Sequence, residues 1–316
     1  MIRYTDLKTG ADVCSLPPFI AALGDFDGVH IGHKKVILDA IDASKSKGIS
    51  TVVWFFADSP KADGERLTVI EEKNELFASL GADFSASEEF SAVKDMSCES
   101  FVKDYLEPLG CRGVACGYNF RFGKGAAGDV TTLEALCKEA GMTFCVSPPV
   151  TSGGVGVSST KIREFLASGD AESAAEMLGR PYSVKGQVEH GRTLGAKIGF
   201  PTVNQYFAPG KMIPRHGVYF SYTTVDGKTY PSVSNVGSRP TVGGHSCRIE
   251  THILDLEREL YGKVVEVSLV KFHRPEIAFS GIGELSAKIA ADREAAKEFF
   301  MTYDLSGKEN RFEAQN

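Results

Sequence analysis

The sequence has 316 residues, of which 42% are hydrophobic and 24% are charged, and this length favours two domains over one. Its formal net charge of −6 at pH 7 argues against a protein that owes its affinity to neutralising many nucleic-acid phosphates, since that needs a concentrated basic surface. The seven cysteines form no C-x-x-C pair and no apolar signal region opens the sequence, so we expect a reduced, cytoplasmic protein. The apolar runs are shorter than the ~20 residues that cross a bilayer, so we expect no membrane span.

The first half of the sequence alternates predicted strands with predicted helices. Residues 19–23 predict a buried strand, residues 34–47 carry apolar side chains at helical spacing, and residues 49–56 predict a second buried strand. Strand, helix and strand in this order form a right-handed parallel unit. The other elements expected in this half are helices at 69–80, 98–109 and 130–140, strands at 111–117 and 143–150, and two short helices between 158 and 179. We therefore predict a doubly wound, Rossmann-like α/β domain over residues 1–180.

After Pro181 the sequence changes to β-branched, partly alternating segments that Asp-Gly and Gly-rich turns interrupt. This pattern is typical of a β-barrel. A helix follows at 283–300, with apolar side chains available to pack at Leu285, Ile289 and Phe299. We therefore place the domain boundary near 180–184, a second domain over 181–303, and a polar tail over 304–316.

The stretch GDFDGVHIGH, residues 24–33, follows the first buried strand at the edge where open α/β sheets bind ligands. Its glycines allow close approach of the backbone, and the start of a helix favours an anion. If the helix begins near Val29, His30 and His33 project from one side of its first turn and can together hydrogen-bond a polyphosphate. Two alternatives stay open: each histidine only caps or packs, or the pair binds a metal, although a third ligand is lacking nearby.

This stretch is similar to the G-x-F-D-G-x-H-x-G-H signature of the bacterial bifunctional riboflavin kinase/FMN adenylyltransferase (FAD synthetase) family, itself similar to other H-x-G-H nucleotidyltransferases. Further segments resemble the family in the family's order: GYNFRFGKG at 117–125, SSTKIR at 158–163, LGRPY at 178–182, GFPTVN at 199–204, NVGSRPT at 235–241 and IETHILDLERELYGK at 249–263. The resemblance implies that residues 1–180 are an FMN adenylyltransferase, a nucleotidyltransferase that makes FAD and pyrophosphate from FMN and ATP. It implies that residues 181–303 are a riboflavin kinase, a six-stranded antiparallel β-barrel with a C-terminal helix.

The resemblance also implies an ATP site in the first domain. His30 and His33 would contact the ATP phosphates, and Ser159, Thr160 and Arg163 would close on the same phosphates from a second helix start. The ATP loop would include Gly24, Phe26, Asp27, Gly28 and Gly32. Such a site needs to supply only positioning and charge stabilisation, because the FMN phosphate is already a nucleophile.

Several of these residues have ordinary structural interpretations. Asp27 either caps its turn or approaches ATP or Mg²⁺, and we favour the turn. Asn119 follows a predicted strand, where its amide can bind ribose or phosphate, and the resemblance places it at the flavin. Phe120 and Phe122 border the flavin or fill the core, and core filling is the expected role for both.

In the second domain the resemblance implies a kinase site around GRTLGAKIGFPTVN, which is not a Walker A loop. Gly195 would contact ATP, and Thr202 and Asn204 would offer oxygen ligands to Mg²⁺ and ATP phosphate. Glu250 would accept the proton of the riboflavin 5′-hydroxyl, unless it is only a solvated strand carboxylate. Arg239 would bind flavin or hold a loop over the site.

The chain departs from the family pattern mostly in the first domain. Asp25 replaces the usual Asn, and its carboxylate would repel a polyphosphate unless it points away. Ser59 replaces a histidine, Ala126 or Ala127 replaces an arginine, and Val203 replaces an alanine of the kinase motif. The main hypothesis is a bifunctional enzyme with riboflavin, FMN, FAD and ATP as its small-molecule partners, with neither nucleic acid nor membrane. The alternatives are a riboflavin kinase with a weakened or lost adenylyltransferase half, a synthetase-like enzyme acting on tRNA, and a binding protein on a decayed scaffold.

Overall fold

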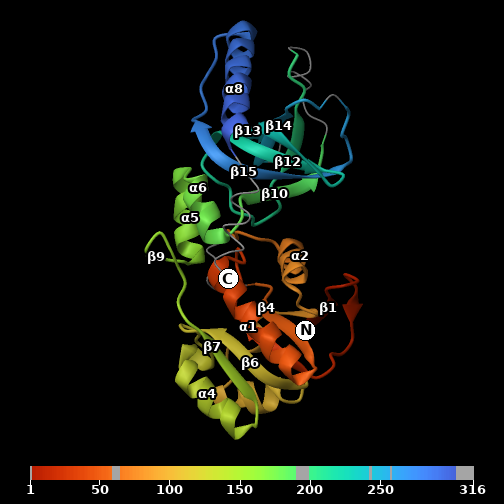
Figure 1. The fold of residues 1–316 in the computed structure, drawn as a ribbon, viewed down its shortest axis with the longest axis vertical. Helices are drawn as coiled ribbons and strands as arrows, with labels where there is room; N and C mark the ends of the chain where they lie inside the picture. The colour runs from red at the N-terminus through yellow and green to blue at the C-terminus, as the bar shows by residue number, and fades with distance from the viewer. Residues whose placement is uncertain (1, 59–64, 190–198, 242–243, 257, 304–316) are drawn as a thin grey trace. The chain divides into compact units, whose positions relative to one another are not determined.

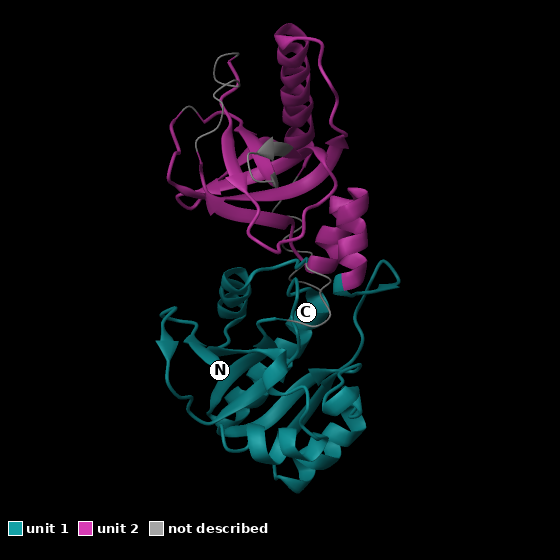
Figure 2. Cartoon of the chain, turned by 180° about the vertical axis from the view of Figure 1, so that it is seen from behind, with its two compact units in different colours: residues 1–159 teal, residues 160–316 magenta. Residues whose placement is uncertain are grey.

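A computed structural model of the chain describes residues 2–58, 65–189, 199–241, 244–256 and 258–303 (Figure 1). The chain divides into two compact units, residues 1–159 and residues 160–316 (Figure 2). Ser59, Gly195 and the tail 304–316 lie outside the described residues. The domain boundary expected near 180–184 stays a prediction.

The first unit is built on a seven-stranded sheet in the order β2-β1-β5-β4-β3-β6-β7. Strands β5, β4, β3, β6 and β7 are parallel, and β1 and β2 join antiparallel at one edge. The strands are β1 (Arg3–Asp6), β2 (Asp12–Val13), β3 (Phe19–Leu23), β4 (Ser50–Phe56), β5 (Phe84–Glu88), β6 (Cys111–Gly117) and β7 (Thr143–Ser147). The strand order reverses between β3 and β6, so the stretch after β3 lies at the position where such sheets bind ligands.

Helices cover both faces of this sheet. One face of β3 packs with α1 (Ile31–Lys47) and α2 (Ile70–Leu80), and the other packs with α4 (Val130–Glu139). The remaining short elements are α3 (Cys98–Ser100), a π-helical segment (Phe101–Leu106), 3₁₀ turns at Phe90–Ala92 and Lys124–Ala126, and the hairpin of β8 (Thr151–Ser152) and β9 (Val155–Gly156). The predicted doubly wound α/β fold is confirmed.

Helices α5 (Ser159–Ser168) and α6 (Ala171–Leu178) precede a six-stranded antiparallel sheet in the order β10-β15-β12-β13-β14-β11. Its strands are β10 (Tyr182–Gln187), β11 (Val203–Tyr206), β12 (Gly217–Val225), β13 (Lys228–Thr241), β14 (Gly244–Ile253) and β15 (Val264–Arg274). The first and last strands in this order nearly close the barrel, because Glu189 N donates to Asn204 O (2.8 Å) and Gln205 Nε2 donates to Gly186 O (3.0 Å). The predicted six-stranded barrel is confirmed.

The inner face of the barrel carries a buried network of hydroxyl groups. Ser221 Oγ and Ser234 Oγ are 2.7 Å apart, and Ser234 Oγ lies 2.8 Å from Thr251 Oγ1. Because strand residues alternate between the two faces, the neighbours of these residues in sequence, among them Asn235 and Glu250, project outward. That outer face is covered by the predicted C-terminal helix, α8 (Ile282–Thr302) (Figure 1).

Candidate active sites

The loop between β3 and α1 in the first unit has a constrained backbone. Phe26 (φ 52°), Gly28 (φ 82°) and Val29 (φ 41°) all adopt the left-handed region. A residue other than glycine in such a conformation costs ~1–3 kcal/mol and persists only where the surroundings hold it. The loop must therefore be anchored by other parts of the unit.

Hydrogen bonds of Asp27 and Gly28 provide these anchors. One carboxylate oxygen of Asp27 accepts from Leu67 N (2.8 Å) and Thr68 N (3.3 Å), and Thr68 Oγ1 accepts from Gly28 N (2.9 Å). The Ser159 hydroxyl donates to Asp27 O (2.8 Å). The carboxylate of Asp27 thus fastens the loop to a segment distant in the sequence, and its expected role in its own turn stays a prediction. A contact from Asp27 to ATP stays a prediction.

The two histidines stack at the start of α1. The helix begins at Ile31 and not near Val29, because the left-handed backbone of Val29 cannot continue into a helix. His30 is the N-cap: its Nδ1 accepts from His33 N (3.2 Å), and the two ring centroids are 3.5 Å apart at an interplanar angle of 16°. A ring nitrogen that accepts carries no proton, so the neutral His30 ring has its N–H at Nε2. Capping therefore uses the unprotonated nitrogen of the ring, and the proton lies on the other nitrogen.

The glycines of the signature fit this arrangement. A Cβ on Gly32 would lie 3.3 Å from the His30 ring, so a side chain there would crowd the stacked pair. The ring of Phe26 is buried and meets His33 edge-on, with centroids 5.3 Å apart. Gly24 joins β3 to this loop. The sequence signature thus describes a packed turn as well as a potential phosphate site.

The residues expected at the flavin of the first domain differ in exposure. Asn119 is exposed, Phe120 is half-buried, and Phe122 is buried in the core, with its ring 5.7 Å from that of Phe101. Phe120 stacks on Phe122 at 6.0 Å. Core packing therefore accounts for both phenylalanines, and a role of the three expected residues in binding flavin stays a prediction.

The other phosphate-binding candidates are divided between the units. Ser159 is the last residue of the first unit, whereas Thr160 and Arg163 belong to the second, and all three lie in the first half of α5. Ser159 has a structural partner in the loop, as described above. The predicted contacts of these three residues with ATP phosphates stay predictions.

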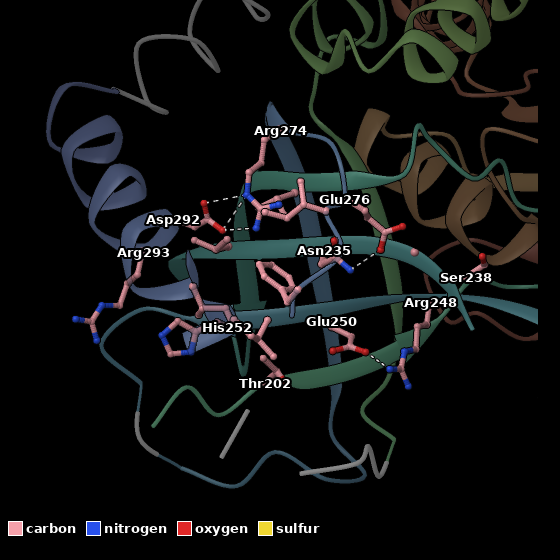
Figure 3. Close-up of a pocket in the computed structure, with 17 residues that line it drawn as sticks. Thr202, Asn235, Ser238, Arg248, Glu250, His252, Arg274, Glu276, Asp292 and Arg293 are labelled. Carbon is pink, nitrogen blue, oxygen red and sulfur yellow. Dashed lines mark hydrogen bonds and ion pairs between the residues drawn. The ribbon is translucent and has the colours of Figure 1, made fainter. Parts of the chain in front are cut away.

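The second unit contains a cavity of about 270 Å³ on the outer face of the barrel (Figure 3). Strands β13 and β14, the residues that follow β15, and α8 supply its walls. Two of the predicted kinase residues, Thr202 and Glu250, line it. Asn204 lies directly opposite Glu250 in the register of β11 and β14, so its side chain projects to the same face. The cavity lining and the strand register therefore bring together the three residues that the sequence singled out.

The cavity wall also contains an ion pair and a hydrogen bond to a carboxylate that the sequence did not predict. Arg248, two residues earlier on the same face, forms an ion pair with the Glu250 carboxylate. Across the sheet, Asn235 Nδ2 donates to Glu276 Oε1 (3.1 Å), and a Cβ on Gly237 would lie only 2.3 Å from that same oxygen. The glycine of NVGSRPT thus admits the Glu276 carboxylate to the cavity wall. Nothing is described of the Arg239 side chain, so its role stays a prediction.

Asp292 of α8 forms the most buried ionic contact of the cavity wall, with 2% of its surface exposed. It accepts from Arg274 through both carboxylate oxygens, with Nη2–Oδ2 at 2.6 Å and Nε–Oδ1 at 3.1 Å, and His273 Nε2 lies 3.2 Å away. Burial lowers the pKa of His273, although Asp292 opposes this shift. A signal for Asp292 was present in the sequence, because it lies four residues before the buried Ala296 on the packed face of the helix.

His252 ties β14 to the segment that carries Thr202. Its Nδ1 lies 2.9 Å from Pro201 O, which is an acceptor, so Nδ1 carries the proton. Burial lowers the pKa of His252, so the neutral ring is favoured. This bond therefore holds the segment of Pro201 and Thr202 against β14 at the cavity.

The described residues hold no group of three or more His, Cys, Asp or Glu side chains that could hold a metal ion. Thr202 and Asn204, the two ligands expected from the sequence, instead offer a hydroxyl and an amide oxygen. Hard oxygen ligands of this kind suit Mg²⁺, which in phosphoryl-transfer sites takes few protein ligands and otherwise binds water and phosphate. The donor set therefore fits this cation.

Comparison with known families assigns a class to each part of the chain. The FAD synthetase family model matches residues 15–161, and the riboflavin kinase family model matches residues 178–300. The chain is therefore a transferase that combines a nucleotidyltransferase domain with a kinase domain.

The relatives combine the same two domains. A bifunctional riboflavin kinase/FMN adenylyltransferase from Listeria monocytogenes is 34% identical over 290 residues, which cover 89% of this chain and 92% of the relative. The protein of the same name from Escherichia coli K12 is 34% identical over 291 residues, with the same coverage. The chain belongs to the bifunctional riboflavin kinase/FMN adenylyltransferase family.

One solved structure has a similar fold over almost the whole chain. It is described as the crystal structure of a macrolide-efflux protein from Streptococcus pneumoniae, with a TM-score of 0.82, 24% identity, and coverage of 95% of this chain and 98% of the other. At this identity the similarity concerns the fold alone. Within the described ranges, no helix has the length and apolar character that crossing a membrane requires.

Proposed function

We propose that this enzyme phosphorylates riboflavin to FMN in its barrel and adenylylates FMN to FAD in its α/β domain, with ATP as the second substrate of both reactions. The observation that carries the proposal is the presence of both family matches in one chain, at residues 15–161 and 178–300. Relatives matched over 92% of their own length carry the same pair of activities in their names. This favours the bifunctional enzyme over a kinase whose transferase half is lost.

In the kinase reaction, Glu250 accepts the proton of the riboflavin 5′-hydroxyl while that oxygen attacks the γ-phosphorus of ATP and ADP leaves. The ion pair with Arg248 holds the carboxylate on the cavity face. Thr202 and Asn204 would hold Mg²⁺ and the phosphate end of ATP, and the cation would neutralise charge on the phosphates. Their placement is supported by the register that sets Asn204 opposite Glu250.

In the adenylyltransferase reaction, an FMN phosphate oxygen attacks the α-phosphorus of ATP and pyrophosphate leaves. The N–H at Nε2 of His30, the ring of His33 and the first backbone N–H groups of α1 stabilise the charge on the phosphates. Ser159, Thr160 and Arg163 contact the same phosphates. The position of the loop at the strand-order reversal of the sheet supports this assignment.

We place FMN of the adenylyltransferase near Asn119 and riboflavin of the kinase in the barrel cavity, with Arg239 beside it. We further propose a cytoplasmic enzyme that needs no nucleic acid. Seven cysteines, all free, and the net charge of −6 support these two points.

Two separate incubations test the proposal. Purified enzyme with riboflavin, ATP and Mg²⁺ must form FMN, and enzyme with FMN, ATP and Mg²⁺ must form FAD and pyrophosphate, each separated by liquid chromatography and detected by flavin absorbance. FMN formation without any FAD from supplied FMN would contradict the second half of the proposal.

A further inference from the structure

A fully buried lysine lies beside the loop that carries the two histidines. Lys73 belongs to α2, where it shares the buried face with Phe77, and its side chain is 0% exposed. Removing an ammonium group from water is costly unless it is paired and hydrogen-bonded. The contacts of the Lys73 ammonium group therefore indicate its role in this domain.

Those contacts go to one residue of the loop. Lys73 Nζ donates to the backbone carbonyl of Asp25 (2.7 Å) and lies 3.9 Å from Asp25 Oδ1. It also lies 4.8 Å from the ring centroid of Phe55, over the face of the ring. A single ammonium thus meets both the backbone and the carboxylate of Asp25.

The carbonyl that Lys73 holds lies immediately before the left-handed residues of the loop. Phe26 follows it with φ 52°, and the Phe26 ring packs on Phe77 of the same helix, with centroids 5.8 Å apart. Helix α2 therefore holds the loop in two ways: Lys73 binds a backbone carbonyl of the loop, and Phe77 packs on the Phe26 side chain. The conformation that it stabilises leads directly into His30, the N-cap of α1.

Charge gives Lys73 a second role at the same place. Asp25, one residue before Phe26 of the loop, places a carboxylate beside the proposed triphosphate site. Asp25 Oδ1 is buried and, among the described residues, accepts no hydrogen bond. Burial lowers the pKa of Lys73, and the charges of Asp25 and Asp27 oppose this shift. An ammonium 3.9 Å from the carboxylate offsets the repulsion that Asp25 would otherwise exert on a polyphosphate.

We propose that Lys73 is a positioning residue of the adenylyltransferase: it holds the Asp25 carbonyl so that the loop places His30 and His33, and it offsets the Asp25 carboxylate so that the loop accepts the ATP triphosphate. This inference rests on the proposed function of the first domain. It explains how the chain accommodates aspartate at position 25.

The first test is Lys73→Met, which keeps the length and removes the charge. FAD synthesis from FMN must lose about tenfold to a hundredfold in kcat/KM for ATP, as for a misplaced catalytic loop, while riboflavin phosphorylation in the same preparation stays within about twofold, because that site is in the barrel. Wild-type values for both reactions would overturn the inference. Lys103→Met is the matched control, since it removes an exposed lysine paired with Glu139 in the same unit (2.9 Å) and must leave both reactions unchanged.

The second test separates charge from loop positioning. Asp25→Asn alone must lower the KM for ATP in FAD synthesis by about two- to fivefold, since the ammonium is then left uncompensated. In Lys73→Met/Asp25→Asn the KM for ATP must return toward the wild-type value while kcat stays low, because the bond to the carbonyl remains absent. An unchanged KM for ATP in Asp25→Asn would overturn the charge offset. This variant tests the charge offset even if Lys73→Met does not fold.

The two proposals fail in different ways. If wild-type enzyme makes no FAD from FMN and ATP, the proposed function of the first domain is wrong. If wild-type enzyme makes FAD and both Lys73→Met and Asp25→Asn match it, only the role of Lys73 is wrong.

Discussion

The two candidate sites are built in different ways. In the α/β domain the site is a short loop with left-handed residues, held by bonds from Leu67, Thr68 and Lys73. In the barrel the site is a sheet face, where strand register sets Asn204 opposite Glu250. The loop site therefore depends on anchors remote in sequence, whereas the barrel site depends on pairing between strands. Changes at one site are expected to leave the other intact, since the two share no described residue.

The largest effect is expected at the proposed base of the kinase. Glu250→Ala must lower FMN formation from riboflavin by about 10²- to 10⁴-fold, because a positioned general base is lost, and must leave FAD synthesis from supplied FMN unchanged. Initial rates from chromatography of the flavins measure both. Glu266→Ala, on β15 and away from the cavity, is the control. Loss of both activities in Glu250→Ala would contradict the expectation that the two sites act independently.

The converse effect is expected at the loop. His33→Ala must lower FAD synthesis from FMN by about 10²-fold, as when one charge-stabilising donor is removed, with riboflavin phosphorylation unaffected. Initial rates of FAD and FMN formation give both values. FAD synthesis at the wild-type rate would mean that the histidine pair only caps and packs.

A stability effect is expected where a charge pair crosses from strand to helix in the barrel. Asp292→Ala leaves the guanidinium of Arg274 without its carboxylate partner, which costs about 3–5 kcal/mol of unfolding free energy for a buried pair. Urea unfolding followed by circular dichroism measures the change. Glu298→Ala, at an exposed position of the same helix, must change it by less than about 0.5 kcal/mol. Equal values for the two variants would show that the ion pair adds nothing.

The smallest effect is a pH dependence of the barrel. Burial lowers the pKa of both His252 and His273 from the ordinary value of 6.5. The unfolded chain therefore binds protons more readily, so this stability is present above pH 6.5 and is lost as pH falls through the lower folded-state pKa values. Urea midpoints at pH 7.5 and 5.5 measure the loss, and His252→Gln must reduce it. A variant with the same loss as wild type would exclude His252 as a cause.

The sequence predicted the parts of the fold that carry strong apolar patterns. Strands β3, β4, β6 and β7 and helices α1, α2 and α4 lie where expected. Strands β1 and β2 are short and polar at the sheet edge, and β5, FSASE, buries Ser85 and Ser87, so no hydrophobic pattern marks them. The left-handed conformation of Val29, immediately before the N-cap of α1, had no local signal in the sequence.

The site residues were predictable where a motif names them and not where they act through distant partners. Lys73 had a usable signal, because it lies four residues before Phe77 on the apolar face of a predicted helix. Its partner Asp25 is 48 positions away in the chain. The pairing of Arg274 with Asp292 likewise needs β15 and α8 to be placed together. Periodicity identifies buried charges of this kind but does not identify their partners.

Complementation between two variants tests the central claim, that one chain carries two independent sites, most directly. Glu250→Ala or His33→Ala alone must convert riboflavin and ATP to FAD at least about 10²-fold more slowly than the wild-type enzyme. An equimolar mixture must restore FAD formation, because FMN made by His33→Ala is adenylylated by Glu250→Ala. Restored FAD formation is the predicted result. A mixture that accumulates FMN and forms no FAD, or that leaves riboflavin unchanged, would contradict it.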